Sequence, residues 1–145
     1  MKTYLLFLDD VRQPKDCCSY MPNAKFYWDN EFVVVKNYDE FVNTITEKYN
    51  NGEFPEIISF DHDLADEHYR PSMYDKDGHY SNYYNDGTFK EKTGYSCAQW
   101  IIDFCIDKAE NLPRYVVHSM NPVGAQNILG LLEGYRRHQL KGGLL

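Results

Sequence analysis

The sequence lacks the features that define several large classes of protein. It contains no apolar run near the roughly 18 residues that a membrane helix needs, and two aspartates directly follow its short apolar start, unlike a signal peptide. Its 4 cysteines have neither the CxxC spacing of a zinc site nor an obvious disulfide framework. We therefore expect a cytoplasmic protein with reduced thiols and no membrane partner.

Positive charge is also scarce. Against 22 acidic residues stand only 15 lysines and arginines, which gives a formal net charge of −7. Such a charge repels a polyanion over most of the surface, so we do not expect duplex DNA as a partner. A small phosphorylated ligand is not excluded, because a bound cation or a helix N-terminus can reverse the field locally.

What the sequence does contain is enough apolar material for one core. Hydrophobic residues make up 43% and aromatic residues 16% of the 145 residues, so we expect a single domain over residues 1–145. Four short apolar runs are continuous rather than alternating, which is typical of strands buried on both faces of a parallel sheet. These runs lie at residues 4–8, 32–35, 57–60 and 115–117.

Helical patterns separate the predicted strands. Residues 38–49 follow a possible Asn37 cap, a second helix is predicted to start at Ser96, and a third has Asn121 as its cap and Pro122 at its first position. The alternation predicts a doubly wound, three-layer α/β fold, with a sheet of mainly parallel strands and helices on both faces.

Two stretches do not follow this alternation. Residues 13–31 have no clear helical period, and the sequence does not decide whether they cover a site or pack on its rim. The tyrosine-rich residues 65–92 combine many charges with little apolar periodicity, which predicts an inserted loop or short hairpin.

Acidic residues follow two of the predicted strands, where ligands bind in doubly wound sheets. Asp9 and Asp10 come after the first strand, and adjacent carboxylates at a partly buried edge require a cation or a shared proton. Asp61, His62 and Asp63 follow the third. If these strands are neighbours, Asp61 meets Asp9 and Asp10 in a site for Mg²⁺ or Mn²⁺.

Polar residues also stand where the fourth strand turns into the last predicted helix. Ser119 and Asn121 lie at a helix start, which favours an anion such as phosphate. His118 titrates near neutral pH and is placed to exchange a proton there. Thr93 precedes the second helix and is a weaker candidate for holding phosphate, as is Arg12 for screening its charge.

Four segments stand in order across nearly the whole chain: LFLDDVR at 6–12, SFDHDL at 59–64, TG at 93–94 and HSMNPVG at 118–124. Together they resemble the cyclic-phosphate-processing receiver-like domain family. The resemblance implies a truncated receiver-like (flavodoxin-like) fold in which Asp9, Asp10 and Asp61 match the receiver acidic pocket. It also implies activity on cyclic phosphates, such as 2′,3′-cyclic RNA ends or cyclic nucleotides.

The chain also departs from ordinary receivers. After the predicted strand at 115–117 and its helix the sequence ends at Leu145, so we expect neither a fifth strand nor the lysine that it carries in receivers. This argues against a signalling module with Asp61 as phosphoacceptor. His62 and His118 beside the acidic residues suit hydrolysis better than a phosphorylation switch.

Three functional hypotheses follow. The first is a metal-dependent phosphoesterase acting on a cyclic phosphate, with His118, His62 and Asp61 as its catalytic residues. The second is a protein that binds or sequesters a cyclic nucleotide or phosphorylated ligand without turnover. The third is the receiver-like signalling module.

Overall fold

The computed structural model describes residues 1–65 and 92–140, so nearly all of the predicted insertion at residues 65–92 lies outside the described residues. Strands and helical segments alternate along the described chain. In order they are β1 (Lys2–Leu8), the 3-10 helix η1 (Pro14–Ser19), α1 (Ala24–Asp29), β2 (Val33–Val35), α2 (Tyr38–Asn50), β3 (Glu53–Phe60), α3 (Gly94–Lys108), β4 (Arg114–Val117) and α4 (Pro122–Leu140).

The four strands form one parallel sheet in the order β2-β1-β3-β4, which confirms the predicted receiver-like α/β fold. The register pairs Leu8 with Phe60 and Phe60 with Val117. The ladder continues past the strand ends, because the N–H of Asp61 donates to Leu8 O at 3.0 Å and that of His118 to Phe60 O at 2.9 Å. The polar residues after β1, β3 and β4 therefore emerge at the same edge of the sheet.

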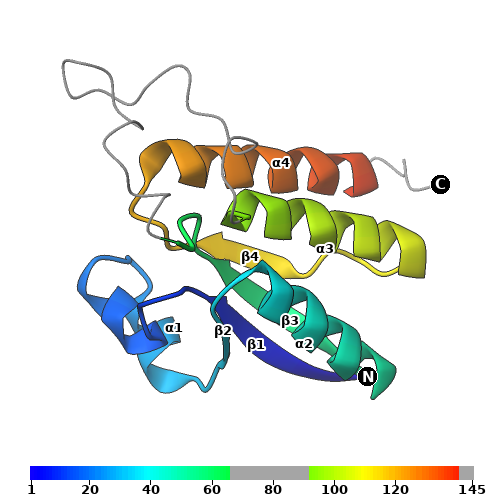
Figure 1. Cartoon of the computed structure of the whole chain (residues 1–145), viewed down its shortest axis with the longest axis horizontal. Coiled ribbons are helices and arrows are strands. Elements are labelled where there is room, and N and C mark those ends of the chain that lie inside the picture. Colours follow the sequence, from blue (N-terminus) through cyan, green and yellow to red (C-terminus); the bar gives the residue numbers. More distant parts are fainter. Residues whose placement is uncertain (66–91, 141–145) are drawn as a thin grey trace.

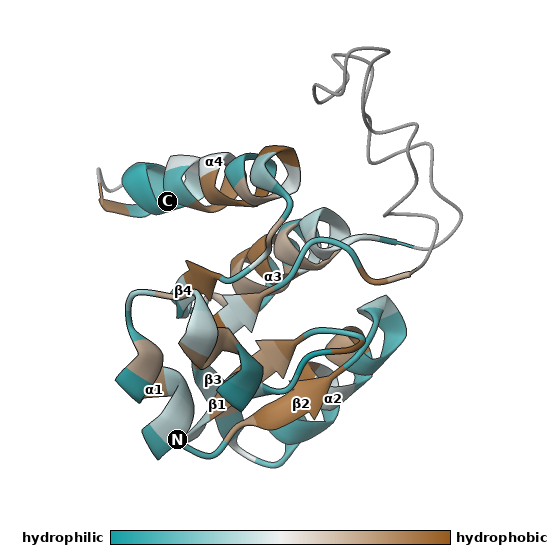
Figure 2. Cartoon of the chain, turned by 90° about the vertical axis from the view of Figure 1, so that its left-hand side faces the viewer, coloured by the Kyte–Doolittle hydropathy of each residue, from teal (hydrophilic) through white to brown (hydrophobic). Residues whose placement is uncertain are grey.

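Both faces of the sheet are covered, because successive side chains of a strand point to opposite sides. Leu6 and Phe60 belong to the larger core, which packs against α2, α3 and α4. Phe7 points the other way, into a smaller core with Cys17 of η1 and Tyr27 of α1. Figure 2 shows α1 on one side of the sheet, α2 and α3 on the other, and hydrophobic strands between them, and Figure 1 shows α3 and α4 side by side.

Two of the three predicted helices begin where the sequence predicts, directly after Asn37 and Asn121, and the third does not. The Asn37 side chain accepts a hydrogen bond from Glu40 N–H, as an N-cap does. The prediction that α3 starts at Ser96 was wrong. That helix begins at Gly94, since the Thr93 side chain accepts from Tyr95 N–H and caps it three residues earlier.

Short elements were missed where the chain offered too little periodicity. Residues 13–31 contain η1 and α1, each of six residues, which is at most two helical turns. β3 is also longer than its apolar run, since it begins at Glu53 and accommodates Pro55 where its register against β1 shifts. Among the described helices, none is long and apolar enough to cross a membrane.

Candidate metal centre

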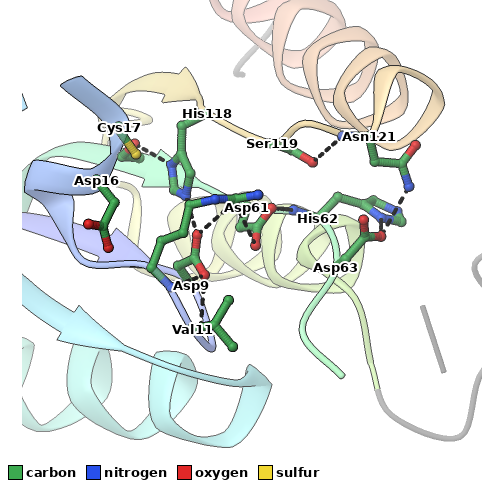
Figure 3. Close-up of polar contacts among 12 residues, drawn as sticks. Asp9, Val11, Asp16, Cys17, Asp61, His62, Asp63, His118, Ser119 and Asn121 are labelled. Atoms are coloured by element: carbon green, nitrogen blue, oxygen red, sulfur yellow. Dashed lines mark hydrogen bonds and ion pairs between the residues drawn. The ribbon is translucent and has the colours of Figure 1, made fainter. Parts of the chain in front are cut away.

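The strand ends bring two carboxylates and one imidazole together. Asp9, Asp61 and His118 each offer one ligand atom, and these atoms all lie within 4.8 Å of one another. All three residues are buried, with relative exposures of 1%, 1% and 0%. Figure 3 shows them pointing toward one another from the ends of β1, β3 and β4. Such a mixed oxygen and nitrogen set has the composition of a divalent-cation site.

Asp9 is held as a carboxylate by four hydrogen bonds. Its Oδ1 accepts from the backbone N–H groups of Val11 at 3.0 Å and Arg12 at 2.8 Å. Its Oδ2 accepts from the Arg12 guanidinium at 3.1 Å and lies 3.0 Å from His118 Nε2. Burial by itself raises the pKa of Asp9, but the bonds from His118 and the two backbone groups outweigh it, and the pKa lies below its ordinary value.

Asp61 is the carboxyl of the group whose ionised form is disfavoured. Its Oδ1 accepts from His62 N–H at 2.9 Å, whereas its Oδ2 is buried with no hydrogen-bond partner within the described residues. Burial first, and then the charge of Asp9, raise the pKa of Asp61 to about 8. A buried carboxylate oxygen without a donor, beside a second carboxylate, fits a divalent cation.

His118 is enclosed on every side. Its Nδ1 lies 2.7 Å from Ser59 Oγ, and its ring stacks on Phe7 with centroids 4.4 Å apart and planes 4° from parallel. Its backbone oxygen accepts from the Tyr20 hydroxyl at 2.7 Å. Burial lowers the pKa of His118 and outweighs the opposing effect of Asp9, which favours the neutral ring.

A second polar group lies on the far side of Asp61 in Figure 3 and holds the start of α4. His62 Nδ1 is 2.8 Å from Asp63 Oδ1, which also accepts from the Asn121 amide at 3.0 Å. Asn121 Oδ1 in turn accepts from Gly124 N–H at 3.0 Å and caps the helix. A Cβ at Gly124 would overlap the His62 ring. His62 is therefore a fully buried packing element between β3 and α4.

Comparison with known proteins gives the fold and this site a family. Residues 4–134 match the profile of a family described as the cyclic-phosphate processing receiver domain. The chain belongs to this family. The match contains all three residues of the candidate metal centre and nearly the whole described chain, and it confirms the resemblance noted in the sequence. Comparisons with curated proteins and with solved structures gave no significant match.

Other residues that the sequence nominated in this receiver domain lie around the centre rather than in it. Asp10 is half-buried and is not part of the three-residue group. Ser119 Oγ accepts from Asn121 N–H at 3.1 Å, and the buried Thr93 hydroxyl caps α3. A cation role for Asp10 and phosphate roles for Ser119, Asn121 and Thr93 stay predictions.

Arg12 pairs with the carboxylates of Asp9 and Asp61, whereas the sequence analysis predicted that it screens the charge of a phosphate. Its Nη1 is 3.1 Å from Asp9 Oδ2 and 3.7 Å from Asp61 Oδ2, and the guanidinium carbon lies 5.6 Å from the centre of the Tyr20 ring. The receiver domain thus carries its own positive charge beside the oxygen atoms that a cation would bind. Among the described residues, Arg12 is a counter-ion of the centre.

Replacing Arg12 by glutamine is expected to tighten binding of Mg²⁺ and Mn²⁺ by about tenfold or more, because it removes a competing positive charge next to both carboxylates. Isothermal titration of each cation into wild type and variant measures the change. Arg114→Gln is the matched control, since Arg114 pairs with Glu56 on an exposed part of the sheet. Unchanged or weaker cation binding by Arg12→Gln would show that Arg12 does not compete at the centre.

Two residues that sequence reasoning did not nominate complete the centre. Ser59 and Tyr27 are both fully buried, and their hydroxyl oxygens lie 2.8 Å apart. Ser59 left a signal, since it is a polar residue inside an apolar strand. Tyr27 left none, because it stands in a stretch where no helical period could be recognised.

Proposed function

We propose that this receiver domain is a phosphoesterase that uses a divalent cation to open a cyclic phosphodiester. The observation that carries the proposal is the buried group of Asp9, Asp61 and His118, in which one carboxylate oxygen has no hydrogen bond within the described residues. Its family is named for cyclic-phosphate processing, which supports the choice of substrate. The proposed substrates are cyclic nucleotides or RNA ends that carry a 2′,3′-cyclic phosphate.

Asp9 and Asp61 are the residues that would hold Mg²⁺ or Mn²⁺, with Asp10 as the further predicted carboxylate. A cation bound there would polarise the phosphoryl oxygens and lower the pKa of an attacking water. The chain's own contribution is to keep Asp9 ionised through the backbone N–H groups of Val11 and Arg12. It also keeps bulk water away from both carboxylates, since each is 1% exposed.

Proton transfer is the step that we assign to His118. Ring opening adds one water across a P–O bond: the hydroxyl joins phosphorus, and the departing oxygen needs a proton. A neutral His118 that carries its proton on Nε2, the nitrogen facing Asp9, can give that proton and recover one from the attacking water. His62 is a poorer candidate, because its ring packs between Asp63 and Gly124.

Binding without turnover is the second candidate, and one observation favours it. His118 is 0% exposed, and both of its ring nitrogens already have partners in Asp9 and Ser59. A ligand reaches His118 only if the side chains around it move. A protein that merely captures a cyclic phosphate needs no such access. For either function we propose a cytoplasmic location, which fits the four free cysteines.

A panel of 2′,3′- and 3′,5′-cyclic nucleotides, tested for binding and for cleavage by wild type and His118→Ala, separates the two candidates. For an enzyme we expect the variant to lose about 10²-fold to 10⁴-fold in rate while it keeps its affinity. Cation-dependent binding of one ring by a wild-type protein that never cleaves it would leave only the binder.

A further inference from the structure

A continuous chain of hydrogen bonds leads from the metal centre into the smaller core. The Tyr27 hydroxyl lies 2.8 Å from Ser59 Oγ, which lies 2.7 Å from His118 Nδ1, and His118 Nε2 lies 3.0 Å from Asp9 Oδ2. All four residues are buried, three of them at 0% exposure and Asp9 at 1%. Burial makes the placement of each proton in these hydrogen bonds consequential, because a misplaced one leaves a buried donor or acceptor unsatisfied.

Asp9 and Tyr27, the two ends of this series of hydrogen bonds, determine which atom donates in each bond. An ionised Asp9 can only accept, so His118 Nε2 must carry a proton and donate it. In a neutral ring Nδ1 is then an acceptor, which makes Ser59 its donor. Ser59 Oγ is left to accept from Tyr27, whose hydroxyl has no other hydrogen-bond partner within the described part of the chain. Every proton in this arrangement has an acceptor.

The reverse direction is unfavourable at both ends. If Nδ1 of His118 carried the proton, Ser59 would accept from it and donate to Tyr27, and the Tyr27 proton would have no acceptor among the described residues. The Nε2 lone pair would also face Asp9 Oδ2 at 3.0 Å. Burial raises the pKa of Tyr27 to about 12, so its hydroxyl keeps its proton and does not become an acceptor only.

We propose that Ser59 and Tyr27 are positioning residues that hold His118 in the tautomer with its proton on Nε2. They act on the centre only through His118, whose ring plane is set by the stack on Phe7. In the cation-free protein His118 is then a hydrogen-bond donor toward Asp9, and its Nε2 can bind a cation only by giving up that proton. This inference concerns proton placement, and its test gives the same answer whether or not cleavage of a cyclic phosphate is found.

Nitrogen NMR of the imidazole side chains, recorded without added metal near neutral pH, tests the tautomer directly. The His118 signals are assigned by their loss in His118→Gln. We expect wild type to show a protonated Nε2 and an unprotonated Nδ1 that accepts a hydrogen bond. A proton on Nδ1 instead, or on both nitrogens, would overturn the proposal.

The variant Asp9→Asn makes the two ends of the hydrogen-bond series favour different tautomers of His118. Two backbone N–H groups donate at the Oδ1 position and one guanidinium N–H of Arg12 at Oδ2, so the asparagine keeps its oxygen at Oδ1. Its amide NH₂ then faces His118 and favours the tautomer protonated on Nδ1. We expect Ser59 and Tyr27 to continue to favour the tautomer protonated on Nε2, so a substantial population of it remains. Adding Ser59→Ala or Tyr27→Phe should shift that population severalfold toward Nδ1.

Tyr20→Phe is the matched control in the Asp9→Asn background. The Tyr20 hydroxyl bonds to the backbone oxygen of His118 and not to its ring, so the tautomer ratio should stay the same. A complete change of tautomer in Asp9→Asn alone would contradict the proposal. An equal ratio with and without Ser59→Ala would do so as well.

Discussion

Asp61→Asn is expected to abolish cation binding and any cation-dependent activity, while it stabilises the cation-free protein at alkaline pH by about 1–3 kcal/mol. The substitution removes a buried negative charge that lies next to Asp9 and has no hydrogen bond on Oδ2 within the described residues. The Oδ1 contact with His62 N–H survives, because an amide oxygen can accept the same bond. Loss of function with gain of stability is typical of a charge kept for binding.

The pH dependence of this effect follows from the raised pKa of Asp61, about 8 in the folded protein. Between the unfolded value, near 4, and that pKa the folded state holds a proton that the unfolded chain has released. The stabilisation from this proton is complete below the unfolded pKa and is lost as pH rises through about 8. Cation-free wild type should therefore lose stability toward pH about 9, and Asp61→Asn should not.

Thermal unfolding followed by circular dichroism, with EDTA and with Mg²⁺ or Mn²⁺, measures both effects. The cation should raise the unfolding temperature of wild type, and more so at higher pH, where it no longer competes with the Asp61 proton. Asp103→Asn is the matched control, since Asp103 is an exposed carboxylate of α3. A cation effect that persists in Asp61→Asn would remove Asp61 from the ligand set.

Gly94→Ala is expected to destabilise the protein by about 3 kcal/mol or more and to weaken cation binding together with it. A Cβ at this first residue of α3 would overlap the backbone oxygen of Asp61 and stand 3.0 Å from the Cα of His62. The helix start and the strand end are also tied by a 2.8 Å bond from Gly94 N–H to His62 O. Backbone cannot give way as a side-chain end does, so either α3 or Asp61 must shift.

Gly130→Ala is the matched control, because the same substitution is expected there to raise the stability of the protein and not to lower it. Gly130 lies on an exposed turn of α4, where a Cβ would meet nothing within 4 Å. Alanine there should stabilise the protein by about 0.5–1 kcal/mol. Denaturant unfolding of both variants measures the difference. If Gly94→Ala were as stable as wild type, the close approach of α3 to the Asp61 backbone would be contradicted.

The fold and the place of the site follow from local sequence signals. Continuous apolar runs marked the parallel strands, and polar residues directly after them marked the edge where a ligand binds. The meeting of Asp9 with Asp61 required one further condition, that β1 and β3 be neighbours, and the sheet order meets it. Such features are visible in a sequence because each depends on a few consecutive residues.

What the sequence could not supply are contacts between residues far apart in it. Arg12 sits on Asp61, and Tyr27 reaches His118 through Ser59, only because η1, α1 and the strand ends pack together. No spacing rule predicts these pairings. The start of α3 was misplaced because the Thr93 side chain caps the helix three residues before Ser96.

A four-stranded sheet also bears on the signalling hypothesis. The described chain contains no strand beyond β4, and thus no counterpart there of the receiver's fifth strand and its lysine. Instead, Arg12 supplies the positive charge next to Asp9 and Asp61. A phosphodonor that fails to label Asp61 would agree with this difference.

The measurement that tests the central claim most directly is cleavage of 2′,3′-cyclic nucleotides and cyclic-ended RNA, followed by phosphorus NMR with Mg²⁺, Mn²⁺ or EDTA. We predict ring opening by wild type and Asp103→Asn with a cation, none with EDTA, and none by Asp61→Asn under any condition. Ring opening that persists in EDTA, or in Asp61→Asn, would contradict a cation-dependent site built on Asp9 and Asp61. Absence of opening for every cyclic phosphate and cation would contradict the catalytic function itself.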